Sequence, residues 1–83
     1  MQADELDALV PRVAARTGAT TGTSRRVVYL LACSGIPTST TMEAKALEAA
    51  TITEKQRVTA RQATIAVLSG APVEGSASPL KDC

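Results

Sequence analysis

The chain has 83 residues, a formal net charge of +1 and no histidine, tryptophan or phenylalanine. This length allows one domain, and a pI near 7.8 excludes the strong overall attraction to nucleic acid typical of domains with a pI above about 9. Without histidine, a glycine-rich phosphate loop or more than two cysteines, we expect a non-enzymatic protein with no cofactor and no metal.

The first predicted helix begins at Asp4, which can act as its N-cap. Its apolar residues recur at helical spacing and are Leu6, Leu9, Val10 and Val13. Pro11 interrupts this pattern, because a proline inside a helix removes a backbone hydrogen bond and costs about 3 kcal/mol. The sequence therefore allows either one kinked helix or two short helices, with the end at Gly18.

Residues 19–23 are rich in threonine and glycine, which predicts a turn. Ser24 is the expected N-cap of the next helix, which runs to Ser34 and is ended by Gly35 and Pro37. The broad apolar face of this helix consists of Val27, Val28, Leu30 and Leu31. It is the most hydrophobic element, so we expect it to form the core.

Two capping boxes are predicted downstream, one from Thr40 and Glu43 and the other from Thr53 and Gln56. Together they imply a short third helix, a tight connection around Ile52 and a longer last helix. The apolar faces are Met42, Ala46, Leu47 and Ala50 in the third helix and Val58, Ile65 and Leu68 in the last.

The last helix is expected to end at Gly70. Residues 71–83 are rich in glycine, proline and serine and hold only Val73 and Leu80 as large apolar side chains, too few to repay ordering. The sequence thus predicts an all-α fold, a bundle of four or five short helices between about residues 4 and 69. A helical domain at 1–70 is followed by a flexible C-terminal tail at 71–83.

Cys33 and Cys83 are expected to be reduced, because a single bridge to the last residue makes a poor disulfide framework. Cys33 is expected to be a small buried apolar residue of its helix. The longest apolar run, Val27 to Cys33, is far shorter than the ~20 residues that span a bilayer. Because the chain opens with acidic residues rather than a basic region, we expect no signal peptide. The sequence therefore predicts a soluble, cytoplasmic protein with no membrane segment.

Residues 13–18, with the sequence VAARTG, and the helix that begins with Ser24-Arg25-Arg26 resemble the two helices and the turn glycine of helix-turn-helix domains. Residues 37–46 are similar to the stretch after the recognition helix in phage-repressor-like members, so the resemblance covers residues 13–50. It implies a small regulator or accessory factor that binds double-stranded DNA, acting as a dimer to read two half-sites.

The resemblance also assigns roles to individual residues. Those that begin the helix entering the major groove are Thr23, Ser24, Arg25 and Arg26. There an arginine can bind guanine O6 and N7, and hydroxyls can hold phosphate. Arg12 and Arg16 then contact the DNA backbone. The alternative is that these arginines form a solvated helix face.

A second hypothesis for the whole chain is a helical adaptor or assembly subunit of a larger complex, such as a phage structural component. It rests on the thin core, the strongly apolar central helix and an Ala/Thr-rich surface that can pack on another protein. Under either hypothesis the chain forms a homodimer or binds a protein partner. The two classes differ in salt dependence, because only DNA binding weakens steeply as salt rises.

Overall fold

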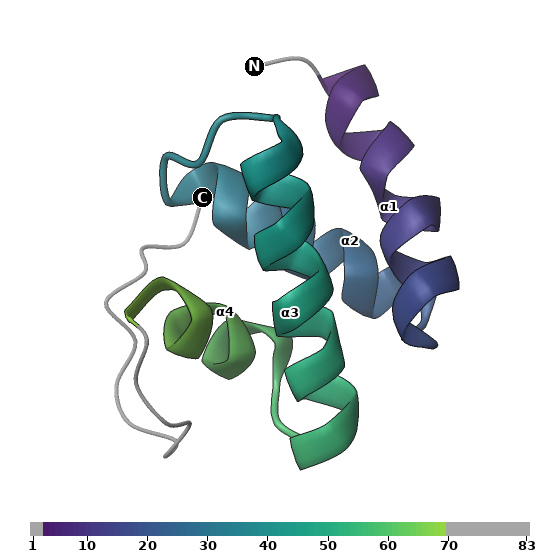
Figure 1. The fold of residues 1–83 in the computed structure, drawn as a ribbon, viewed down its shortest axis with the longest axis vertical. Helices are drawn as coiled ribbons and strands as arrows, with labels where there is room; N and C mark the ends of the chain where they lie inside the picture. Colours follow the sequence, from purple (N-terminus) through teal and green to yellow (C-terminus); the bar gives the residue numbers. More distant parts are fainter. Residues whose placement is uncertain (1–2, 70–83) are drawn as a thin grey trace.

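The structure, a computed structural model, describes residues 3–69, which form four α-helices (Figure 1). They are α1 (Ala3–Thr17), α2 (Thr21–Cys33), α3 (Thr40–Gln56) and α4 (Ala60–Ser69). The predicted all-α bundle of four or five helices is confirmed. The expected helix end at Gly70 and the tail at 71–83 lie outside the described residues.

The central pair of the bundle is α2 and α3. Each of them packs against all three other helices, whereas α1 and α4 do not contact one another. In Figure 1, α1 and α3 run side by side while α2 crosses behind both. Between residues 3 and 69, no helix combines the length and the apolar character that crossing a membrane requires.

α1 is one continuous helix that contains Pro11. The predicted apolar residues lie on its buried face: Leu6, Leu9, Val10 and Val13. Burying each large apolar side chain is worth about 1.5–3 kcal/mol, so together they outweigh the cost of an interior proline. The helix ends as expected at Gly18, which has φ +79° and donates its N–H to the Ala14 carbonyl at 3.0 Å.

α2 begins one turn earlier than the sequence predicts. Its N-cap is Thr20, whose hydroxyl accepts a hydrogen bond from the Thr23 N–H at 3.0 Å. The predicted cap, Ser24, lies inside the helix and is fully buried, so that prediction is wrong. The earlier start places Ser24 on the same face as Val27, Val28 and Leu31, which all pack into the core.

The C-terminal end of α2 is closed by backbone hydrogen bonds around Gly35, as predicted. The Gly35 N–H binds the Ala32 carbonyl at 3.0 Å, and the Ile36 N–H binds the Leu31 carbonyl at 3.1 Å. This pairing requires a left-handed residue, and Gly35 has φ +93°.

Cys33, the last residue of α2, differs from both expectations. It is exposed rather than buried, and it is disulfide-bonded rather than reduced. The other cysteine of the sequence, Cys83, lies outside the described residues.

Both predicted capping boxes are displaced. The N-cap of α3 is Ser39 rather than Thr40, and its hydroxyl accepts from the Met42 N–H at 3.4 Å. Thr53 lies within α3 and donates its hydroxyl to the Ala49 carbonyl at 2.8 Å. The helix therefore continues past the connection that was expected around Ile52.

A capping box does occur, at the start of α4. The Thr59 N–H donates to Gln62 Oε1 at 3.2 Å, and the Gln62 N–H donates to Thr59 Oγ1 at 3.1 Å. Arg57 makes the preceding turn with φ 53°, a left-handed conformation that is unfavourable for a side chain with a Cβ.

On the side of α3 and α4, the core consists mainly of small residues and a hydroxyl bonded within its own helix. The buried face of α3 consists of Met42, Ala46, Ala49 and Ala50. Thr64 of α4 is fully buried and donates to the Ala60 carbonyl at 2.7 Å, one helical turn earlier. Ser24 is equally buried, but its hydroxyl has no hydrogen-bond partner among the described residues.

We predict that Ser24→Ala leaves the free energy of unfolding unchanged or raises it by about 1 kcal/mol, because a buried hydroxyl without a partner costs about 1–3 kcal/mol. The control is Thr64→Val, which keeps the side-chain shape and removes a satisfied hydroxyl; it should lower stability by about 0.5–1.5 kcal/mol. Urea denaturation measures both. A loss for Ser24→Ala that equals the loss for Thr64→Val would show that the Ser24 hydroxyl is bonded.

We also predict that Arg57→Gly stabilises the fold by up to about 1 kcal/mol, since glycine adopts left-handed dihedrals without steric cost. Gln56→Gly, at the neighbouring helical position, should instead destabilise by about 1 kcal/mol. Thermal unfolding measures both changes. Two losses of equal size would contradict the left-handed turn at Arg57.

Candidate nucleic-acid interface

The connection between α1 and α2 consists of Gly18, Ala19 and Thr20. The Gly18 N–H and the Thr20 hydroxyl bond to the two helix ends, and Ala19 is buried against the core. The turn is further held by Thr17, whose hydroxyl accepts from the Ala19 N–H at 3.2 Å. A short connection thus fixes the N-terminal end of α2 against α1.

Only a narrow strip of α2 reaches the surface, because α1, α3 and α4 all pack against this helix. The exposed residues before its last turn recur at three- and four-residue intervals and are Thr21, Gly22, Arg25, Arg26 and Tyr29. We call this set the α2 stripe. It presents two guanidinium groups and one aromatic ring in the N-terminal two-thirds of the helix.

The four residues that the sequence predicts at the start of this helix have different environments. Arg25 and Arg26 are exposed in the α2 stripe. Thr23 is half-buried, and its hydroxyl accepts from the Thr20 hydroxyl at 3.1 Å. Ser24 is fully buried, so its side chain cannot contact a ligand at the surface, and it does not belong to the candidate site.

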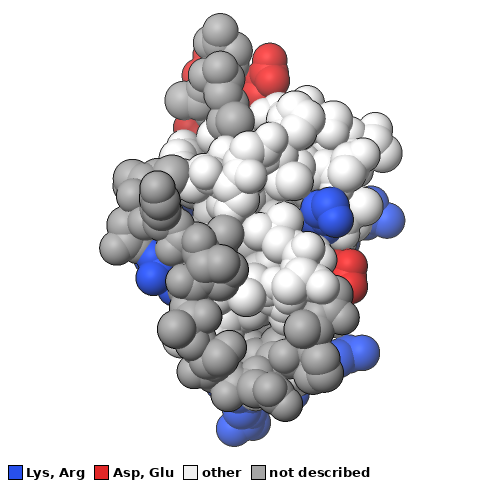
Figure 2. Space-filling view, turned by 90° about the vertical axis from the view of Figure 1, so that its left-hand side faces the viewer, with Lys and Arg blue, Asp and Glu red and all other residues white. Residues whose placement is uncertain are grey.

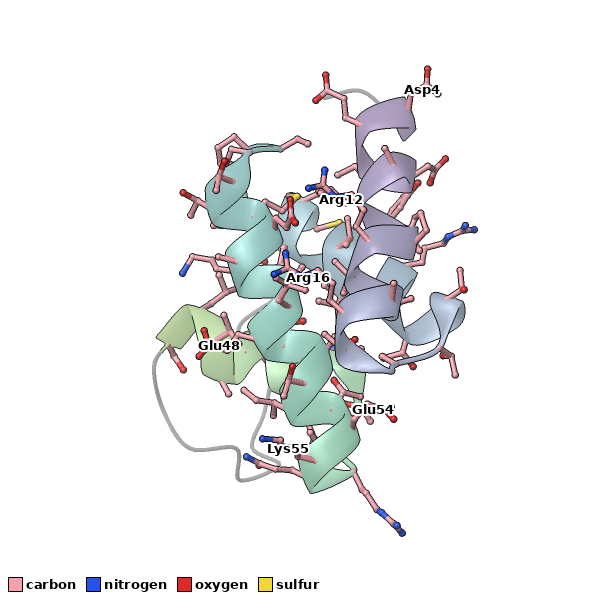
Figure 3. The ribbon with its side chains drawn as sticks, turned by 45° about the vertical axis from the view of Figure 1, so that its right-hand side comes forward. Asp4, Arg12, Arg16, Glu48, Glu54 and Lys55 are labelled. Carbon is pink, nitrogen blue, oxygen red and sulfur yellow. The ribbon has the colours of Figure 1, made fainter. Side chains whose placement is uncertain are left out.

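Arg12 and Arg16 point from α1 towards α3 (Figure 3). Arg12 Nη2 lies 3.2 Å from Glu43 Oε1, and Arg16 Nη1 lies 3.5 Å from Glu43 Oε2. Both arginine side chains remain 64% exposed, so each pair contributes at most about 1 kcal/mol. Glu43 therefore joins α3 to α1 instead of completing the predicted capping box.

The two pairs of arginines do not form one surface. Asp7 of α1 accepts a hydrogen bond from Tyr29 of the α2 stripe, whereas Arg16 of the same helix bonds to α3. At 3.6 residues per turn, positions 7 and 16 lie roughly 180° apart around the helix axis. Arg12 and Arg16 thus flank α3, on the other side of α1 from the α2 stripe.

Tyr29 is the residue of this site that the sequence analysis did not single out. Its hydroxyl donates to Asp7 Oδ1 at 3.0 Å, across 22 positions of the sequence. This hydrogen bond is the main cause that raises the pKa of Tyr29, with smaller contributions from desolvation and from the Asp7 charge, while Arg25 lowers it. The one feature of the sequence that points to Tyr29 is its position four residues after Arg25. This spacing is about one helical turn, so the two residues lie on the same face of the helix.

Charge is unevenly distributed along the chain. Between residues 8 and 42 the sequence contains four arginines and no aspartate or glutamate. The side of the molecule at the left of Figure 1 is mostly uncharged over its described surface and carries a few basic and acidic side chains (Figure 2). Within residues 3–69, no group of three or more histidine, cysteine, aspartate or glutamate side chains is placed to hold a metal ion.

Comparison of the chain with protein-family models, curated proteins and solved structures found no match. A function is therefore inferred from the geometry of the α2 stripe.

Proposed function

We propose that this protein is a small helix-turn-helix-like factor that binds double-stranded DNA through the α2 stripe. The proposal rests on the exposure of Arg25 and Arg26 and on the availability of their guanidinium groups. Both are exposed, and within residues 3–69 neither forms an ion pair, whereas Arg12 and Arg16 are both engaged by Glu43. Their guanidinium groups are available to bind an anionic partner.

The position of these arginines on α2 suits a DNA duplex. A recognition helix contacts base edges with residues near its N-terminus, and arginine binds guanine O6 and N7 with two parallel hydrogen bonds. Thr21 is exposed in the first turn, where hydroxyls and the positive end of the helix dipole favour phosphate. The first turn of α2 contains no acidic residue that would oppose this contact.

The small size of the α2 stripe favours a dimeric form of the bound protein. One stripe reaches few base pairs, and the net charge of +1 gives little general attraction to DNA. Two copies on adjacent half-sites would double the contacts, so the proposal includes a homodimer on the duplex.

The exposed side chains give less support to the alternative, an assembly subunit that docks through an apolar face. Among the described residues, Tyr29 is the exposed large hydrophobic side chain, and the other large apolar side chains are at least partly buried. A partner for the α2 stripe therefore has to present anionic and hydrogen-bonding groups rather than an apolar patch.

We predict that the double variant Arg25→Ala/Arg26→Ala folds normally but binds duplex DNA more weakly by at least about 1 kcal/mol, the lower end for one bidentate base contact. The salt dependence of binding should also flatten by about one unit of slope for each phosphate that is no longer neutralised. Fluorescence anisotropy with a labelled duplex over a salt series measures both quantities.

The matched control is Lys45→Ala/Lys55→Ala, which removes the same charge from α3 and should leave the affinity near that of the unmodified protein. Equal losses of affinity for the two double variants would mean that only net charge matters. If the unmodified protein shows no salt-sensitive duplex binding, the DNA proposal is wrong and the assembly-subunit hypothesis takes precedence.

A further inference from the structure

The α2 stripe has an acidic neighbour that belongs to a different helix. Asp7 of α1 is exposed and accepts the hydrogen bond from the Tyr29 hydroxyl at 3.0 Å. Tyr29 is fixed one turn after Arg25, and the charges of Asp7 and Arg25 both act on its hydroxyl. A carboxylate therefore lies at the edge of the surface that presents Arg25 and Arg26.

We propose that Asp7 limits the sequence-independent binding of DNA phosphates at the α2 stripe. The inference rests on the proposed function and names a role for a residue outside the α2 helix. Its carboxylate opposes the phosphates that run along the edge of the groove, while Arg25 and Arg26 remain able to reach base edges.

Sequence-independent binding and base recognition have different physical origins. Sequence-independent binding comes almost entirely from neutralising phosphates, and each charge at the interface changes the salt slope by about 0.9. Base recognition depends instead on directional hydrogen bonds. A fixed negative charge beside the stripe therefore weakens the phosphate-dependent part of binding to any duplex while leaving the base contacts in place.

The alternative role for Asp7 is structural, as a clasp between α1 and α2. Asp7→Asn separates the two roles, because asparagine keeps an acceptor oxygen for the Tyr29 hydroxyl and removes the charge. The fold should be retained, and the pKa of Tyr29 should fall towards its ordinary value, because the charge of Asp7 helps to raise it. Titration of the tyrosine ultraviolet absorbance measures this effect without any DNA.

We expect Asp7→Asn to bind a labelled duplex of random sequence about 2- to 8-fold more tightly at moderate salt, with a steeper salt dependence. The control is Glu5→Gln, which removes the same charge from the same helix. Position 5 lies roughly 160° from position 7 around the axis, so this variant should change the affinity little.

The outcomes are distinguishable. Tighter binding by Asp7→Asn, with Glu5→Gln unchanged, supports the inference. If the unmodified protein binds and Asp7→Asn binds equally, or if both variants bind more tightly by the same factor, the inference is overturned and the proposed function stands. If the unmodified protein does not bind duplex at low salt, the proposed function is overturned, and the inference with it.

Discussion

The packing of α2 against three helices decides most of what this protein presents to its surroundings. Val27, Val28 and Leu31 are completely buried, and they hold α2 in the centre of the bundle with one strip of surface left. In a helix covered on its other sides, the exposed positions recur once per turn. Arg25, Arg26 and the single aromatic residue of the chain occupy these positions.

Small residues, together with hydroxyls that bond within their own helix, make up most of the buried faces of α3 and α4. Alanine forms most of the buried face of α3, which lets its neighbours approach closely. Thr17, Thr51 and Thr64 each donate to the carbonyl one turn earlier, at 2.7–2.8 Å, so they add no unsatisfied polar groups. A chain with few large apolar residues can close a core in this way.

The sequence predicted the features that depend on local spacing. The apolar stripe of α1, the glycines that end α1 and α2 and the all-α fold follow from periodicity and from backbone dihedrals. Helix starts were predicted less well, because serine and threonine are frequent and many of them suit an N-cap. Whether Thr20 or Thr59 acts as the N-cap depends on which face of the following helix is buried. That is a tertiary property.

The candidate site was predicted only in part, because some of its contacts are also tertiary. Exposed Arg25 and Arg26 follow from the apolar pattern of their own helix. Two contacts join distant segments and cannot be predicted from local sequence. They are the hydrogen bond from Tyr29 to Asp7 and the ion pair between Arg12 and Glu43. Sequence spacing therefore identified the cationic residues but not which of them have a carboxylate partner.

The most direct test of DNA binding through the α2 stripe is to follow the amide chemical shifts of the isotope-labelled protein as duplex DNA is added at low salt. We expect the amide signals from Thr21 to Tyr29 to shift progressively, while those of Glu43 and Glu48 of α3 remain unchanged. Shifts centred on the α1–α3 side around Glu43, or no shifts in α2, would contradict it.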